Sequence, residues 1–347
     1  MEYRPLGRSD IKVSAICLGS MTWGEQNSEA EGFEQMDYAF EQGVNFIDTA
    51  EMYPIATRAE TYGRTEEIIG NWMAARGNRE KVILATKIVG PGAERFSYIR
   101  GGETHFNRKH ITAAVETSLK RLKTDYIDLY QLHWPDRSTN DFGQLAYQHE
   151  DGAVETDFAE TLEALAEVVK AGKVRQVGVS NENPWGVMRF LALAEQGKGP
   201  RMVSIQNPYS LLNRSFETRM AEVSIREDVG LLAYAPLAAG TLTGKYLNNH
   251  WPKGARRTLW PGNRRYQGPQ ADAATAAYVK LARDQGLDPA QMAIAFVLSQ
   301  RFTTSAIIGA TSMDQLKTDI EAVNVRLNEA TLNGIEAIHK VYTYPCP

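Results

Sequence analysis

The sequence is poor in the residues that hold small secreted proteins or metal sites together. It contains two cysteines, Cys17 and Cys346, which are too few and too far apart to predict a disulfide framework. Its six histidines show no H-x-H or other ligand spacing, so no metal site is expected. Two free thiols are typical of a protein in a reducing compartment, and we predict a cytoplasmic location.

Long apolar runs and an excess of positive charge are absent as well. No stretch approaches the roughly 18 apolar residues of a membrane span, and the first ten residues, MEYRPLGRSD, lack the apolar core of a signal peptide. The net charge of −4 gives no basic field for nucleic acid or an anionic membrane. We therefore expect neither nucleic acid nor a membrane as a partner.

What is present is a repeated pattern of short, almost continuously apolar runs, each followed by turn residues and a helical stretch. Such β-branched runs are typical of strands that are buried on both faces, as in a parallel sheet. The eight runs span residues 14–20, 44–50, 81–87, 126–133, 174–181, 202–208, 230–237 and 305–310.

Helix signals lie between these runs. Ser28 with Glu31 forms a capping box, Asp157 opens another helix, and Ser312 with Gln315 opens a third. Eight strands alternating with helices predict an α/β protein with a (β/α)8 TIM barrel that occupies residues 1–347 as one domain. A doubly wound sheet is the main competitor, but the G-x-G-x-x-G turn typical of its dinucleotide sites is missing.

The remaining segments complete the predicted architecture. Residues 2–16 resemble a small β-hairpin that caps the barrel floor. Three connections, at 88–107, 135–156 and 246–271, exceed ordinary loop length, and long connections in compact enzymes are usually lids or binding loops.

Polar side chains end nearly every predicted strand, and the C-terminal ends of barrel strands are where such folds place their active sites. A single polar residue at a strand end is often only a turn residue, whereas six together on one rim predict a site. These strand ends hold Asp48, Lys87, His133, Ser180 with Asn181, Gln206 and Tyr234.

Asp48, Lys87 and Tyr53 predict a buried charge pair beside a phenol. A buried carboxylate needs a positive partner, and Lys87 can form an ion pair with Asp48 across the barrel mouth. A lysine there favours the phenolate and so acts to lower the pKa of Tyr53. His133, just before Trp134 and Pro135, points from the rim and in its neutral form can donate a hydrogen bond to a substrate oxygen.

These residues resemble the catalytic tetrad of the aldo-keto reductase superfamily. Asp48 and Tyr53 stand in FIDTAEMY, Lys87 in ATK and His133 in DLYQLHWPD. The resemblance continues in order through VGVSN, QNPYSLLNR, LLAYAPLAAGTLTGKY and IIGATSMDQL, and it is strongest to the bacterial Tas-like reductases, a branch related to potassium-channel β subunits. It implies NADPH-dependent reduction of an aldehyde or ketone to an alcohol, with Tyr53 as proton donor, Lys87 and Asp48 tuning it, and His133 polarising the carbonyl.

The resemblance also implies a set of NADPH/NADP+ contacts. Ser180, Asn181 and Gln206 would bind the carboxamide, and Tyr234 would stack on the nicotinamide ring. The substrate would contact Trp23, Tyr53, His133 and Trp134. The further expected cofactor residues are Ser20, Met21, Asp48, Pro236, Leu237, Lys245, Arg256, Gly309, Thr311, Ser312, Gln315 and Asp319.

Three points stay open at this level. After Gln315 and Leu316 the family carries x-Glu-Asn, whereas this chain has Lys317, Thr318 and Asp319, so the preference for NADPH over NADH is undecided. A Schiff-base aldolase with Lys87 as nucleophile and a slow-turnover NADPH-binding regulatory subunit are the alternative functions. The carbonyl substrate and a homo-oligomeric state cannot be read from the sequence.

Overall fold

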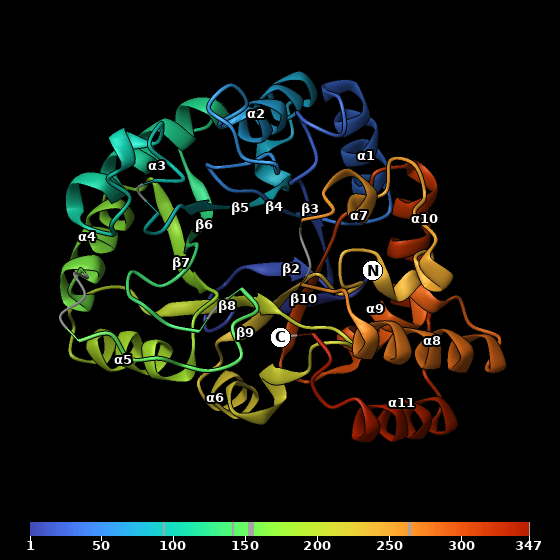
Figure 1. The fold of residues 1–347 in the computed structure, drawn as a ribbon. Helices are drawn as coiled ribbons and strands as arrows, with labels where there is room; N and C mark the ends of the chain where they lie inside the picture. The colour runs from blue at the N-terminus through green and yellow to red at the C-terminus, as the bar shows by residue number, and fades with distance from the viewer. Residues whose placement is uncertain (93, 141, 152–155, 263–264, 347) are drawn as a thin grey trace.

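Eight parallel strands close into a barrel at the centre of the molecule (Figure 1). The computed structural model describes residues 1–346 apart from 93, 141, 152–155 and 263–264. Each strand pairs with the next in the chain, and the last pairs with the first to close the ring, as the TIM-barrel prediction requires. The strands are β3 (Ile16–Gly19), β4 (Phe46–Asp48), β5 (Ile83–Ile88), β6 (Ile127–Leu132), β7 (Val174–Ser180), β8 (Met202–Pro208), β9 (Gly230–Tyr234) and β10 (Thr303–Ile308).

The strands are buried on both faces because alternate residues point into the barrel and out towards the helices. Inside, Phe46, Ala85 and Leu129 belong to one apolar cluster. Outside, a larger apolar cluster packs the strands against the helices. In β4, β5 and β6, the inward-facing residue two positions after each of these apolar residues is polar. The residues there are Asp48, Lys87 and Gln131.

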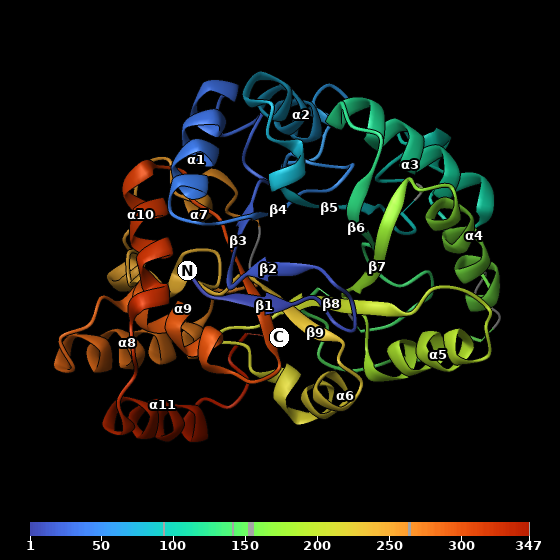
Figure 2. The ribbon, with the colours of Figure 1, turned by 180° about the vertical axis from the view of Figure 1, so that it is seen from behind.

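A two-stranded antiparallel hairpin, β1 (Tyr3–Pro5) with β2 (Lys12–Ser14), covers the opposite end of the barrel. It lies in front of the barrel in Figure 2 and behind it in Figure 1. Leu6, Ile11 and Val13 join the apolar cluster inside the barrel, so the hairpin closes the floor as predicted.

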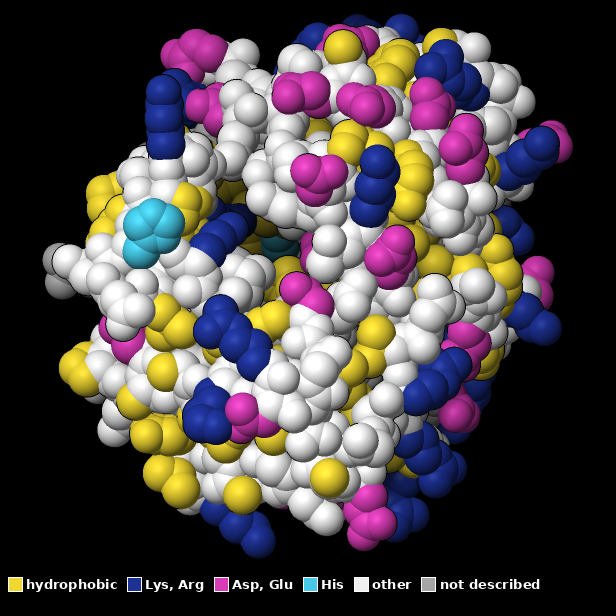
Figure 3. Space-filling model, turned by 90° about the vertical axis from the view of Figure 1, so that its right-hand side faces the viewer, with side chains coloured by type: hydrophobic (Ala, Val, Ile, Leu, Met, Phe, Trp, Pro, Cys, Tyr) yellow, Lys and Arg dark blue, Asp and Glu magenta, His cyan; other side chains and the backbone are white. Residues whose placement is uncertain are grey.

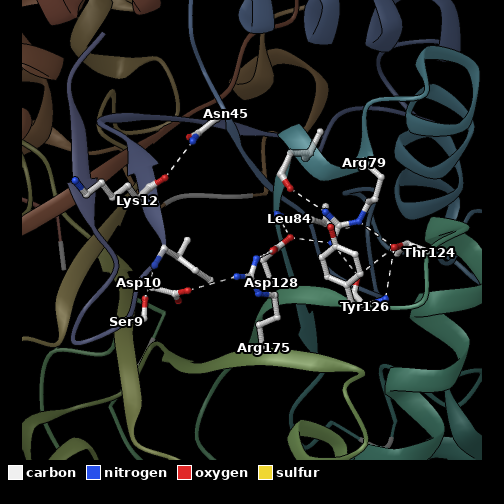
Figure 4. A network of polar contacts seen from close by, with 12 residues as sticks. Ser9, Asp10, Lys12, Asn45, Arg79, Leu84, Thr124, Tyr126, Asp128 and Arg175 are labelled. Atoms are coloured by element: carbon white, nitrogen blue, oxygen red, sulfur yellow. Dashed lines mark hydrogen bonds and ion pairs between the residues drawn. The ribbon is translucent and has the colours of Figure 1, made fainter.

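A polar network ties the floor together (Figure 4). Asp128 of β6 is almost fully buried and accepts hydrogen bonds from Arg79 at 2.8 Å, from the Leu84 amide at 3.0 Å and from Arg175 at 2.9 Å. Arg175 also reaches Asp10 of the hairpin turn at 3.8 Å. Two guanidinium groups thus neutralise one buried carboxylate.

Helices form the outer ring, and the three predicted helix starts are confirmed. Ser28 and Glu31 form both bonds of a capping box, while Asp157 and Ser312 accept from backbone amides in the first turns of their helices. Among the described residues, no helix combines the length and apolar character needed to cross a membrane. The helices are α1 (Glu29–Glu41), α2 (Arg64–Arg76), α3 (Arg108–Leu122), α4 (Phe158–Lys170), α5 (Pro184–Glu195), α6 (Met220–Arg226), α7 (Arg256–Leu259), α8 (Pro269–Asp284), α9 (Pro289–Ser299), α10 (Met313–Glu321) and α11 (Glu329–Val341).

The three long connections follow β5, β6 and β9, so all of them leave from the same end of the barrel. The first, 88–107, contains a short 3-10 turn at Arg100–Gly102. The third, 246–271, contains α7 and ends in the first turn of α8. Positions 93, 141, 152–155 and 263–264 of these connections lie outside the described residues.

Candidate active site

Asp48 and Lys87 form a buried ion pair at the polar end of the barrel. Lys87 Nζ donates to Asp48 Oδ2 at 2.6 Å and to the backbone oxygen of Thr49 at 2.7 Å. The lysine side chain has no exposed surface and that of the aspartate is 4% exposed. Burial acts to lower the pKa of Lys87, but the Asp48 carboxylate, together with Tyr53 and Cys17, leaves the pKa raised. Lys87 therefore stays charged.

Two glutamines complete the surroundings of the carboxylate. Gln206 of β8 and Gln131 of β6 each donate from Nε2 to Asp48 Oδ1, at 2.8 and 3.1 Å. Gln131 was not among the residues predicted for the site. Its signal is a polar residue inside the apolar run of β6, on the same inward face as His133.

Tyr53 lies over this pair, with Lys87 Nζ 5.0 Å from the centre of its ring. Burial raises the pKa of the phenol, while the positive charges of Lys87 and Arg256 act in the opposite direction. The lysine thus has the predicted sign, but burial exceeds its effect and the pKa is raised rather than lowered. Tyr53 keeps its proton at neutral pH and can donate it.

His133 faces Tyr53 from the end of β6. The two ring centres are 5.8 Å apart and the rings meet edge to face. Burial, and then the nearby positive charges of Lys87 and Arg95, hold the pKa of His133 well below its ordinary value. Its Nδ1 is buried without a hydrogen-bond partner in the described part of the chain. The ring is therefore neutral and has a polar atom available.

Asn181 joins the ends of neighbouring strands beside these residues. Its backbone adopts a left-handed φ of 52°, and its Nδ2 donates to the His133 backbone oxygen at 2.9 Å. Tyr234 donates its hydroxyl to Asn181 Oδ1 at 2.7 Å, and Ser180 donates to the Gln206 backbone oxygen at 2.8 Å. Four of the residues predicted to contact the nicotinamide are thus next to one another and to His133.

The segment 236–246, which begins with Pro236 and Leu237, makes a tight turn after β9. Its Ala238, Ala239 and Gly240 all have left-handed φ values, between 49° and 84°. A Cβ on Gly240 would lie 2.8 Å from Lys245 Nζ, so glycine lets the lysine fold back against the turn. A hollow of about 270 Å³ opens beside it. Its lining residues are Ala239, Thr241, Tyr246, Arg256, Arg257, Trp260, Tyr266 and Gln267.

These features fit a dinucleotide, because a pyrophosphate needs positive charge and close approach to the backbone. Arg256 of α7 reaches across to the turn that follows β3, where its Nη1 lies 3.4 Å from Met21 Sδ. Ser20, next to Met21, donates to the Asp48 backbone oxygen at 2.8 Å. Figure 3, seen from the side of α8 and α10, shows a hollow with basic side chains beside it.

The start of α10 holds the last group of predicted cofactor residues, which follow Gly309. Ser312 caps the helix, and Thr311 donates from its amide and its hydroxyl to Gln315 Oε1, each at 3.1 Å. Asp319, one turn further, is 3% exposed. Burial and the charge of Asp288 raise its pKa to about 7, although Lys245 opposes this. Lys245 and Asp319 therefore lie within electrostatic reach of each other.

Aromatic rings line the mouth next to His133. The centre of the Trp134 ring lies 4.9 Å from that of His133 and 5.7 Å from that of Phe96. Trp134 also borders a hollow of about 330 Å³, whose lining includes Pro135, Asp136 and Arg137. Trp23 belongs to a different apolar cluster: it has no exposed surface, packs among the residues between barrel and helices, and donates from Nε1 to Gln35 of α1. The structure thus joins Trp134, but not Trp23, to Tyr53 and His133.

Comparison with known proteins identifies the family of the chain. The sequence model of the Aldo/keto reductase family matches residues 15–340. The chain is 55% identical to the protein named tas of Escherichia coli over the full length of both. It is 35% identical to the uncharacterized oxidoreductase YrpG of Bacillus subtilis, covering 97% of this chain and 96% of that one, and 31% identical to the aldo-keto reductase YhdN of the same organism, covering 97% and 93%. The chain belongs to the aldo/keto reductase family and is an oxidoreductase.

Proposed function

We propose that the protein reduces aldehydes or ketones to alcohols with NADPH, and that Tyr53 is the proton donor. The observation that carries this proposal is the arrangement of Tyr53 between two neighbours, with the charged Lys87 5.0 Å from its ring centre and the neutral His133 ring 5.8 Å away. A proton donor thus has a buried positive charge and a neutral imidazole ring as direct neighbours.

Each residue has a role that follows from its surroundings. The bound NADPH supplies the hydride. As the carbonyl is reduced, negative charge grows on its oxygen, and Tyr53 donates a proton to that oxygen. Lys87, held by Asp48, favours the phenolate that remains on Tyr53. His133 donates a hydrogen bond that positions the carbonyl.

The residues that would hold NADPH form three groups. Ser180, Asn181 and Gln206 would bind the carboxamide, with Gln206 using Oε1 because its Nε2 already donates to Asp48. Tyr234 would stack on the nicotinamide. Ser20 and Met21 would lie beside the cofactor at the end of the first barrel strand. The pyrophosphate and adenosine groups would contact Pro236, Leu237, Lys245, Arg256, Gly309, Thr311, Ser312, Gln315 and Asp319.

Lys87 is poorly suited to the alternative role of a Schiff-base nucleophile. Nucleophilic attack needs the neutral amine, whereas Asp48 holds this lysine charged and raises its pKa. Trapping with borohydride and a carbonyl compound should therefore leave Lys87 unlabelled. A slow-turnover NADPH-binding regulatory protein differs from the reductase only in rate, so steady-state turnover decides between them.

The test is a fluorescence titration with NADPH and NADH, followed by turnover measurements on a panel of aldehydes. We expect binding of NADPH and multiple turnover with at least one aldehyde. Tyr53→Phe removes only the hydroxyl, so it should abolish reduction while NADPH affinity stays within about twofold of wild type. Substantial reduction by this variant would remove Tyr53 from the donor role.

A further inference from the structure

Glu51 is a fully buried carboxylate that stands between Asp48 and Tyr53 in the chain. Its backbone amide donates to the Lys87 backbone oxygen at 3.1 Å. Its Oε1 accepts from the Val89 amide at 2.7 Å. Glu51 thus contacts the backbone on both sides of Ile88, the last residue of β5, and fixes the segment that carries Tyr53 to that strand.

The Glu51 carboxylate forms an ion pair with Arg100, a residue of the long connection 88–107. Arg100 donates from Nη1 to Oε2 at 2.7 Å and from Nη2 to Oε1 at 2.9 Å, a two-point contact that sets orientation as well as distance. The arginine side chain is 13% exposed. Because the pair is buried, removing either side chain would leave the other charge buried without a partner, which is strongly destabilising.

The backbone at Arg100 is shaped for this contact. Arg100 has a left-handed φ of 47°, which is uncommon for a residue with a side chain. Gly101 and Gly102 continue the left-handed turn with φ values of 70° and 87°. The turn is closed by the Gly102 amide, which donates to the Ile99 backbone oxygen at 2.9 Å. Such a conformation persists where surrounding contacts hold it.

The same connection supplies aromatic surface to the mouth of the site. Phe96 and Ile99 are buried in an apolar cluster that also packs against Tyr53 and Trp134. The Phe96 ring lies 5.7 Å from that of Trp134, which in turn lies next to His133. We call Phe96 and Ile99 the apolar wall of the site. The position of this wall relative to Tyr53 depends on the contacts that hold the 88–107 connection in place.

We propose that Glu51 and Arg100 are positioning residues that hold the 88–107 connection as the wall against the bulky end of an aldehyde or ketone substrate. The inference rests on the reductase function proposed above. Neither side chain touches the reacting atoms. The pair acts by fixing the distance between the apolar wall and Tyr53, so its effect should fall on the binding of large substrates rather than on proton transfer.

The test compares Arg100→Met with a matched control, Arg79→Met. Arg79 also pairs with a buried carboxylate, Asp128, and its side chain is 16% exposed, but it lies at the barrel floor. We expect Arg100→Met to raise KM for benzaldehyde, an aromatic substrate, about tenfold, to change KM for propanal less than twofold, and to leave kcat within about threefold. Arg79→Met should leave both KM values unchanged.

Amide hydrogen exchange provides a readout that needs no turnover. Exchange across residues 94–104 should rise in Arg100→Met and stay at the wild-type level in Arg79→Met. Arg100→Lys keeps the charge but loses the two-point contact, so it should give intermediate KM and exchange, and it serves if the methionine variant does not fold.

The possible outcomes distinguish failure of the positioning role of Glu51 and Arg100 from failure of the proposed reductase function. Wild-type KM for both aldehydes together with wild-type exchange in Arg100→Met overturns the positioning role. If KM for benzaldehyde rises equally in both methionine variants, the role is also overturned, because general destabilisation would then be the cause. A wild-type protein that binds NADPH but reduces no aldehyde counts against the reductase, while the exchange comparison still decides whether Arg100 anchors the connection.

Discussion

The Lys87 ammonium group and the Asp48 carboxylate are 2.6 Å apart, and both are buried. Burial makes such a pair costly to separate, because each charge is stabilised mainly by the other. Gln131 and Gln206 satisfy the second carboxylate oxygen, so the position of Asp48 is fixed from three strands. The result is a positive charge of fixed position beneath Tyr53.

Replacing Lys87 with methionine should damage both activity and stability. Loss of the positive charge removes the group that favours the phenolate, and we expect kcat to fall about 10²- to 10⁴-fold. The Asp48 carboxylate is left buried without its cation, which should cost about 3–5 kcal/mol in the free energy of unfolding. Steady-state kinetics and urea denaturation measure the two effects.

A double variant separates the two losses. Asp48→Asn combined with Lys87→Met leaves two neutral side chains, so most of the stability should return while kcat stays low. Recovery of activity in the double variant would contradict the role of Lys87 beside Tyr53. A double variant as unstable as the single one would contradict the electrostatic explanation of the stability loss.

The pH dependence of reduction should follow from Tyr53 and His133. The pKa of Tyr53 is raised above its ordinary value of 10, so the donor stays protonated through neutral and mildly alkaline pH. The pKa of His133 is well below 6.5, so the ring does not change charge there either. We expect kcat/KM for reduction to be level between about pH 6.5 and 9. A break near pH 6.5 that disappears in His133→Gln would show that His133 titrates in that range.

The fold was predictable because its signals are local. The run at 44–50 is almost continuously apolar, as a strand buried on both faces should be, and the capping box of Ser28 and Glu31 marks a helix start directly. The predicted strand boundaries were less accurate. β5 extends to Ile88, one residue beyond the predicted run 81–87, and β10 begins at Thr303, two residues before the predicted run 305–310.

Site residues that end a strand could be predicted from the sequence, whereas contacts made by a folded loop could not. Asp48, Lys87 and His133 stand at strand ends, so the barrel topology brings them together. Arg100 meets Glu51 only because the 88–107 connection folds back, and nothing local in the sequence signals that. The pKa of Tyr53 also required the structure, because the burial that dominates it is not a property of FIDTAEMY.

Removing the buried carboxylate at the barrel floor should destabilise the protein without affecting its chemistry. Asp128→Ala leaves the Arg79 and Arg175 guanidinium groups without their shared partner, and we expect a loss of about 3–5 kcal/mol in urea denaturation. Asp10→Ala is the control, because that exposed carboxylate should contribute less than about 1 kcal/mol. Equal losses for the two variants would show that burial does not set the effect.

Asp319 should make the protein less stable as the pH rises. Its pKa is about 7 in the folded protein against an ordinary 3.8, so between these values the folded state holds a proton that the unfolded state has released. Stability then falls from about pH 4 to pH 7. Asp319→Asn removes this loss and should gain about 1–3 kcal/mol at pH 8, with no gain near pH 3.5. Asp314→Asn, on the exposed side of the same helix, is the control and should show no gain that grows with pH. A constant difference between Asp319→Asn and wild type from pH 3.5 to 8 would mean that the carboxyl does not titrate near neutrality.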